Sequence, residues 1–135
     1  MKVVIDTNVL VSAMLSPGVS RRVLLFIADH DQIQWLATNP ILNEYIQVIS
    51  RPKFRFPQTL IENWTRLFSE RITVIAEPIE RALLARDPKD TIFIDCALAG
   101  NAEFLISGDS DLSGLKLPSG TIVLNPAAFE LHLIQ

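Results

Sequence analysis

The chain has 135 residues, of which 49% are hydrophobic, and a formal net charge of −3. This length suffices for one hydrophobic core but not for two, so we expect a single domain that spans residues 1–135. The composition excludes disordered and fibrous classes, and no apolar run approaches the roughly 20 residues needed to span a bilayer.

Cysteine usage and the N-terminal residues indicate the compartment. The single cysteine, Cys96, cannot form an internal disulfide, and we expect it to be a buried thiol. Asp6 and Asn8 interrupt the first apolar run, which argues against a secretory signal. We therefore expect a soluble, cytoplasmic protein without a membrane partner. The negative charge argues against nucleic-acid binding over the whole surface, although local basic patches remain compatible with it.

Apolar runs of strand length alternate with segments that are long enough for helices. The expected strands are Val3–Ile5, Ile33–Leu36, Ile72–Ile75, Phe104–Ile106 and Thr121–Leu124. The expected helices are Thr7–Leu15, Ser20–Asp29, Ile41–Ile49 after an Asn39 cap, Gln58–Glu70, a helix from Asp90 after an Asp87 cap, and Pro126–Ile134. The expected turns or loops are Ser16–Gly18, Arg51–Pro57 and Leu117–Gly120. The alternation predicts an α/β fold with a mainly parallel central sheet.

Acidic residues follow two of the expected strands. Asp6 comes directly after Val3–Ile5, and Asp109 and Asp111 follow Phe104–Ile106 in a turn rich in Gly, Asp and Ser. Open α/β sheets bind ligands in a crevice at the carboxyl ends of their strands, so these are positions for a site. Two simpler explanations stay open, since Asp6 can cap the next helix and such a turn can lack a function.

Asp90 lies on the apolar face of its expected helix. It shares this face with Phe93, Ile94 and Ala97, so we expect its carboxylate to point inward, where an unpaired charge is costly. The simpler explanation is an acid in the first turn that interacts with the helix dipole. Asp95 lies on a different face, and we expect it to be solvated.

Glu44 lies in a similar place, with Ile41 and Val48 as its neighbours on the helix, although a boundary residue would look the same. Taken together, two strand ends and two helices each direct an acid toward one crevice. Carboxylates at about 4 Å repel by roughly 4 kcal/mol at an effective dielectric of 20, so such a cluster needs cations or protons. Ligands that are all oxygen suit Mg²⁺ or Mn²⁺ rather than Zn²⁺.

The order of these motifs resembles PIN-domain proteins, in particular the toxins of bacterial toxin–antitoxin pairs. The likeness covers nearly the whole chain and rests on Val3–Leu10, Glu44, Asp87–Asp90, Ala97–Ala99 and Leu105–Leu112. It implies a PIN-like α/β/α sandwich and a nuclease, an endoribonuclease that hydrolyses RNA with Mg²⁺ or Mn²⁺. It also implies a homodimer and a small antitoxin protein that inhibits it.

Carried over by position, the resemblance implies a set of catalytic acids, which are Asp6, Glu44, Asp90 and Asp109. Asp6, Asp90 and Asp109 would bind metal, and Glu44 would position or deprotonate the attacking water. Asp111 is an alternative to Asp109 or a helper. Asn8 and Ser107 match polar positions that orient the site, and Ser107 stands where Thr is commoner.

The segment Arg51–Pro57 interleaves three basic residues with two aromatic residues, which is the chemistry that single-stranded RNA requires. The residues expected to contact RNA are Arg51, Lys53 and Arg55, with Arg21 and Arg22 as an extension. The alternative is an ordinary loop between helices in which both Phe side chains pack inward.

Two other functions stay open. A haloacid-dehalogenase-like phosphatase also has an Asp after its first strand and a later Gly-Asp pair, which Asp6 and Gly108–Asp109 fit. Its second acid is missing, because Asn8 stands at that position. A PIN-like scaffold that binds RNA or protein without cleavage is the second alternative, and the presence of all four acids argues against it.

Overall fold

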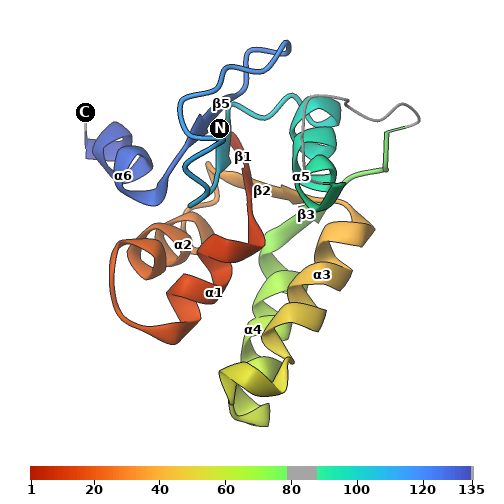
Figure 1. Ribbon diagram of the computed structural model, residues 1–135, viewed down its shortest axis with the longest axis vertical. Helices are drawn as coiled ribbons and strands as arrows, with labels where there is room; N and C mark the ends of the chain where they lie inside the picture. The colour runs from red at the N-terminus through yellow and green to blue at the C-terminus, as the bar shows by residue number, and fades with distance from the viewer. Residues whose placement is uncertain (79–87, 135) are drawn as a thin grey trace.

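The computed structural model describes the backbone of residues 1–78 and 88–134 and the side chains of residues 1–78 and 91–133. In this part of the chain we find five strands, six α-helices and one short 3-10 helix (Figure 1). In chain order they are β1 Lys2–Ile5, α1 Thr7–Leu15, α2 Val19–Asp29, β2 Gln34–Ala37, α3 Asn39–Ile49, η1 Pro52–Phe54, α4 Gln58–Arg71, β3 Ile72–Val74, α5 Pro88–Ala99, β4 Phe104–Ile106, β5 Ile122–Leu124 and α6 Pro126–Ile134.

The strands form one parallel sheet in the order β3-β2-β1-β4-β5. β1 is the central strand, and its Val3 pairs with Trp35 of β2 and with Phe104 of β4. A central parallel strand is covered on both faces, which explains an apolar run without polar alternation. Val3, Val4 and Ile5 are each 0% exposed. The predicted α/β fold with a mainly parallel sheet is confirmed.

Helices cover both faces of the sheet and make the molecule an α/β/α sandwich (Figure 1). α5 packs against β1, β2 and β4, whereas α2 packs against β2 and contacts α1 and α6. α3 and α4 pair with each other and extend away from the sheet. An aromatic cluster joins this pair to the core, because the Phe68 ring lies 5.9 Å from that of Trp35 and 5.4 Å from that of Tyr45.

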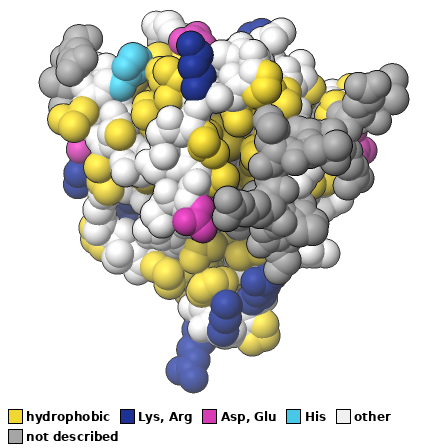
Figure 2. Space-filling model, turned by 45° about the horizontal axis from the view of Figure 1, so that its top comes forward, with side chains coloured by type: hydrophobic (Ala, Val, Ile, Leu, Met, Phe, Trp, Pro, Cys, Tyr) yellow, Lys and Arg dark blue, Asp and Glu magenta, His cyan; other side chains and the backbone are white. Residues whose placement is uncertain are grey.

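The corner between α3 and α4, which was predicted as a turn or loop, contains the three-residue 3-10 helix η1. Pro52 has a fixed φ that suits the first position of a helix, and Arg55, at φ 52°, ends the turn in the left-handed region. Lys and Arg side chains gather at this lower end of the molecule (Figure 2). The exposed cations of the segment are Arg51, Lys53 and Arg55.

One predicted helix cap is wrong. Thr38 rather than Asn39 is the residue that precedes α3, and Asn39 is already helical. The cap predicted at Asp87 lies outside the described residues. Boundaries of one or two residues depend on terminal hydrogen bonds, which residue preferences alone do not define.

A sharp bend of 109° separates α1 from α2. No single helix in the described ranges is long and apolar enough to cross a membrane, and this bent pair meets those criteria only when its two members are combined. Arg21 of α2 stabilises the bend, since its guanidinium donates to the carbonyl oxygens of Ala13 at 2.7 Å and Met14 at 3.4 Å. These are carbonyls at the end of α1, which lack partners within the helix.

Arg22 forms a salt bridge with Glu130 of α6, with 2.9 Å between Nε and Oε2. The hydrogen bond and the opposite charge raise the pKa of Arg22 and lower that of Glu130. Both arginines that were predicted to extend an RNA-binding patch are thus engaged in contacts that hold helices together.

The prediction that Asp95 is solvated is wrong, because Asp95 is 6% exposed. α5 packs against α3 as well as the sheet, so it buries more than one face, and the side chains from Phe93 to Ala97 are all buried. Cys96 is the buried thiol expected from the sequence, and burial raises its pKa to about 12.

Gly100, just after α5, has no room for a side chain beside Leu36 of β2. A Cβ there would lie 2.5 Å from Leu36 Cδ1 and 3.1 Å from Ile75 Cδ1. We expect Gly100→Ala to lower the free energy of unfolding by about 1–3 kcal/mol, because Leu36 is buried and has little room to shift. Urea unfolding would measure this. Gly18→Ala is the control, since a Cβ there meets nothing within 4 Å; equal losses in both variants would contradict the prediction.

Candidate functional site

Asp6 follows the carboxyl end of β1, the central strand. β2, the next strand in the chain, lies on one side of β1, and β4 lies on the other side, so the strand order changes direction here. Such a switch point is where open α/β sheets form their ligand crevice. Asp6 is 6% exposed. Its Oδ2 accepts hydrogen bonds from Ser107 Oγ at 2.8 Å and from Asn8 Nδ2 at 3.3 Å.

Asp6 also caps α1, because its Oδ1 accepts a hydrogen bond from the backbone N–H of Asn8 at 3.4 Å. The capping explanation that was open from the sequence is therefore correct, and it does not compete with a role in a site. A cap uses one carboxylate oxygen at the positive end of the helix, and the other oxygen faces the loop after β4.

The loop after β4 is bound to Asp6 through two side chains. Ser107, which is 0% exposed, receives the N–H of Asp109 at 3.1 Å while its hydroxyl donates to Asp6. Asn8 accepts the N–H of Gly108 at 3.0 Å. The predicted orienting positions Asn8 and Ser107 thus both contact the Asp6 carboxylate.

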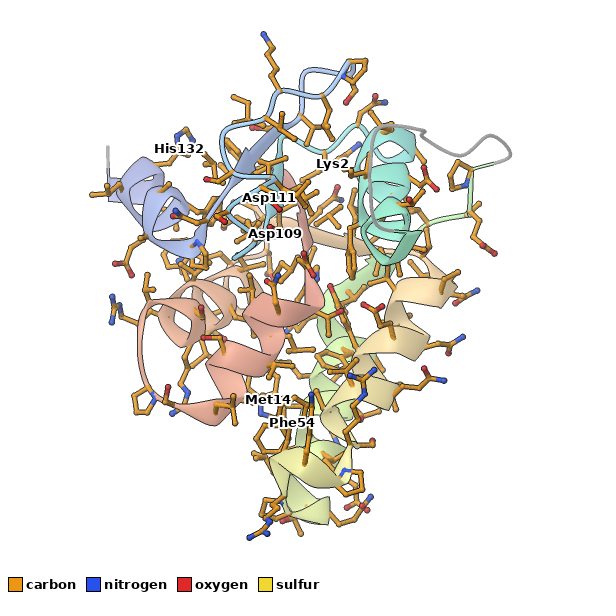
Figure 3. The ribbon with its side chains drawn as sticks, in the orientation of Figure 1. Lys2, Met14, Phe54, Asp109, Asp111 and His132 are labelled. Atoms are coloured by element: carbon orange, nitrogen blue, oxygen red, sulfur yellow. The ribbon has the colours of Figure 1, made fainter. Side chains whose placement is uncertain are left out.

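Asp109 and Asp111 differ in position although they lie two residues apart. Asp109 is half-buried and its Oδ1 accepts the N–H of Asp111 at 2.9 Å, whereas the Asp111 side chain is exposed. Figure 3 shows both at the carboxyl-end side of the sheet, in the loop above the start of α1. Asp109 is therefore the acid that belongs to the hydrogen-bonded part of this loop.

Glu44 is held by a residue that the sequence analysis did not select. The hydroxyl of Thr7, the first residue of α1, donates a short hydrogen bond to Glu44 Oε2. The next residue of α3, Tyr45, donates to the carbonyl oxygen of Ile5 at the end of β1. Burial, with the nearby charges of Asp6 and Glu44, raises the pKa of Tyr45 well above its ordinary value, so the phenol remains a donor.

Asp90 is the remaining predicted acid, and its side chain lies outside the described residues. Its backbone lies in the first turn of α5, the helix that packs against β1 and β4. Phe93, one turn further along α5, lines the same cavity as Asp6. Among the described side chains, no group of three His, Cys, Asp or Glu is placed to hold a metal ion.

A cavity of about 480 Å³ connects these features. It is lined by Asp6, Thr7, Asn8, Val11, Glu44, Gln47, Val48, Arg51, Phe54 and Phe93. Its acidic end is formed by the start of α1 and the middle of α3, and its other end is formed by Arg51 and Phe54 near η1. A second hollow, of about 460 Å³, lies beyond Asn8 and has no carboxylate among the described residues that line it.

The oxygen donors around Asp6 are carboxylates, hydroxyls and an amide, which are hard ligands that suit Mg²⁺ or Mn²⁺. Cys96, the single cysteine, is buried as a thiol in α5 and does not line the cavity. The chemistry of the donor set therefore fits a hard divalent cation.

The fold and this cavity define a three-layer α/β protein with acids at the switch point of its sheet. Residues 2–111 match the family model described as PIN domain. The chain belongs to the PIN-domain family, which confirms the family resemblance.

Two known proteins are similar to this chain. The uncharacterized protein MJ1680 of Methanocaldococcus jannaschii is 31% identical over 121 residues, which cover 85% of this chain and 75% of that protein. A chain in the crystal structure of VapBC2 from Rickettsia felis, bound to a DNA fragment from their promoter, is similar in fold with a TM-score of 0.62. That match has 15% identity and covers 93% of this chain and 98% of the other.

Ser107 supplies a buried hydrogen bond between two distant segments. We expect Ser107→Ala to lower the free energy of unfolding in the absence of metal by about 1–3 kcal/mol, because Asp6 Oδ2 loses a donor in a buried place. Ser69→Ala is the control, since Ser69 bonds a carbonyl on the exposed surface of α4 and should change stability by less than about 0.5 kcal/mol. Urea unfolding that gives the same value for both variants would refute this role.

Proposed function

We propose that this protein is a metal-dependent endoribonuclease that hydrolyses RNA phosphodiesters. The observation that carries this proposal is the carboxylate of Asp6, buried at the end of the central strand and facing a cavity that also contains Glu44. Membership of the PIN-domain family, whose members are generally nucleases, supports the same class of chemistry.

In this proposal Asp6, Asp90 and Asp109 hold Mg²⁺ or Mn²⁺, with Asp111 as a helper of Asp109. Asp6 is the direct ligand best supported by its contacts, because Ser107 and Asn8 fix its orientation. The backbone of Asp90 lies in the first turn of α5, a helix that packs against β1. A divalent cation held by these acids would supply Lewis acidity, which would activate water and offset charge on the phosphate.

The residues of the chain have separate roles in the proposed hydrolysis. Glu44 positions the attacking water and accepts its proton, and Thr7 holds Glu44 by donating to Oε2. Val48 and Phe93 form a buried apolar part of the cavity wall beside these groups. The exposed cations near η1 attract the phosphates of the strand.

Replacement of Asp6 tests the proposed nuclease. We expect Asp6→Asn to lower cleavage of an unstructured RNA in Mg²⁺ or Mn²⁺ by at least about a hundredfold, because it removes a charged ligand and keeps the shape of the side chain. EDTA should abolish cleavage by the unaltered protein. Asp29→Asn, on the exposed end of α2, is the control and should cleave normally. An Asp6→Asn variant that retains metal-stimulated cleavage would remove Asp6 from the mechanism.

The hydrogen bond from Thr7 makes a separate prediction about Glu44. Thr7→Val keeps the shape of the side chain and removes the donor, so we expect kcat to fall by about tenfold to a hundredfold with little change in KM. Thr7→Ser keeps the hydroxyl and should restore most of kcat. Thr65→Val, which removes a hydroxyl that bonds within α4, serves as the control. Equal activity in the Val and Ser variants would mean that Thr7 does not position Glu44.

We propose further that the enzyme is the toxin of a toxin–antitoxin pair, with a small antitoxin protein as its partner, and that it acts in the cytoplasm as a homodimer. Support comes from the similarity in fold to a chain of the VapBC2 structure, which covers 93% of this chain. The phosphatase alternative loses its basis, because the family match is to the PIN domain. The non-cleaving scaffold is the alternative that the Asp6→Asn experiment separates from the enzyme.

A further inference from the structure

The part of the cavity farthest from Asp6 has a chemistry of its own. Arg51 and Phe54 line it together with Gln47, and Figure 3 shows Phe54 at the end of α3 that is distant from Asp109. On α3, Gln47 follows Glu44 by three residues, so both project from one side of the helix. Arg51 comes two residues after the end of α3, in extended backbone before η1, and lines the same cavity.

The two aromatic residues of this corner have different surroundings. Phe56 packs against the hydrophobic core, as the simpler reading of the sequence expected, and Phe54 is absent from that cluster. Phe54 is half-buried and stacks on Phe56, with 5.6 Å between the ring centroids and an interplanar angle of 17°. The core thus holds Phe56, and Phe56 holds the Phe54 ring at the cavity.

A flexible cation lies over the Phe54 ring. Lys53 Nζ is 5.0 Å from the ring centroid, and Lys53 is exposed. Such an exposed cation–π contact is weak, so a ligand with a π-face can take its place. Among the described residues, no carboxylate forms a salt bridge with Arg51, Lys53 or Arg55. These three charges are therefore available to phosphates.

We propose that Phe54 and Arg51 form a subsite for an unpaired nucleobase of the RNA strand that is cut at Asp6 and Glu44. The base stacks on the Phe54 ring, the Arg51 guanidinium contacts the base or its phosphate, and Lys53 moves from the ring to the backbone. This inference rests on the proposed function, because that function identifies the bound strand as RNA. Its consequence is selection for unpaired RNA, because a base in a duplex has no free face for the ring.

The test is equilibrium binding in EDTA, where metal-assisted cleavage does not interfere. Fluorescence anisotropy measures the affinity of the full chain for an unstructured RNA hexamer and for six hexamers that each lack one base. We expect one abasic position, or two adjacent ones, to weaken binding by between about fivefold and a hundredfold, the range that stacking of one base on an aromatic side chain produces. A hexamer paired with its complement should bind more weakly than the single strand.

Variants of Phe54 connect this effect to the ring. Phe54→Leu should weaken binding of the intact hexamer and lose the dependence on the abasic position. Phe54→Tyr keeps an aromatic ring, so it should keep the affinity of the unaltered protein and its dependence on the abasic position. Phe26→Leu is the matched control, because Phe26 is an exposed ring on α2 that stacks on His30. Lys53→Ala with Arg55→Ala should lower the salt dependence of binding, by about 1.4 in the logarithmic slope, and leave the abasic effect in place.

A flat abasic profile in the unaltered protein would overturn the subsite, and so would a profile that Phe54→Leu leaves unchanged. The flat profile needs no variant, so a folding defect cannot obscure it, and it is also the result expected if the ring serves a protein partner. Failure of the proposed nuclease looks different: RNA would remain intact in Mg²⁺ while the binding profile still depends on Phe54. A nuclease without this subsite would cleave RNA and give a flat profile.

Discussion

The burial of one carboxylate at the end of the central strand governs the rest of the site. Asp6 is 6% exposed, and a carboxylate in such a place is tolerated only when hydrogen-bond donors or cations surround it. The donors come from α1 and from the loop after β4, so satisfying this charge joins two segments that are 101 residues apart in sequence. These hydrogen bonds organise the loop and leave the negatively charged oxygens of Asp6 at the switch point of the sheet. A hard cation bound there would lower the free-energy cost of burying this charge.

A second polar link sets the orientation of α3 relative to this charge. The Tyr45 hydroxyl donates to the carbonyl oxygen of Ile5, the last residue of β1, and its pKa is raised by burial. Because Glu44 precedes Tyr45, fixing the phenol brings Glu44 to the hydroxyl of Thr7. α3 carries Glu44 near its middle and ends beside the cations of η1. One cavity therefore has carboxylates at one end and Arg51 at the other, an arrangement suited to a polyanion that needs a metal at one phosphate and basic contacts at its neighbours.

Much of the fold and part of the site could be predicted from residue patterns. The buried run of β1, the alternation of strands and helices and the acids at two strand ends are local features, and the structure contains them. The errors have tertiary causes. Asp95 was expected in solvent because one apolar stripe implies one buried face, yet α5 is covered by the sheet and by α3. Arg21 has a contact that its basic character alone does not reveal, because it bonds carbonyls at the end of α1, and its predicted contact with RNA stays a prediction.

By itself the sequence determined the class of fold and the presence of acids after two of its strands, because apolar periodicity and the residues that end a strand are properties of short segments. The tertiary structure alone decided which hydroxyls serve those acids and which aromatic ring faces the cavity. Thr7 meets Glu44 across 37 residues and Ser107 meets Asp6 across 101. Contacts between such distant residues depend on the crossing of strands and helices, which no local pattern contains.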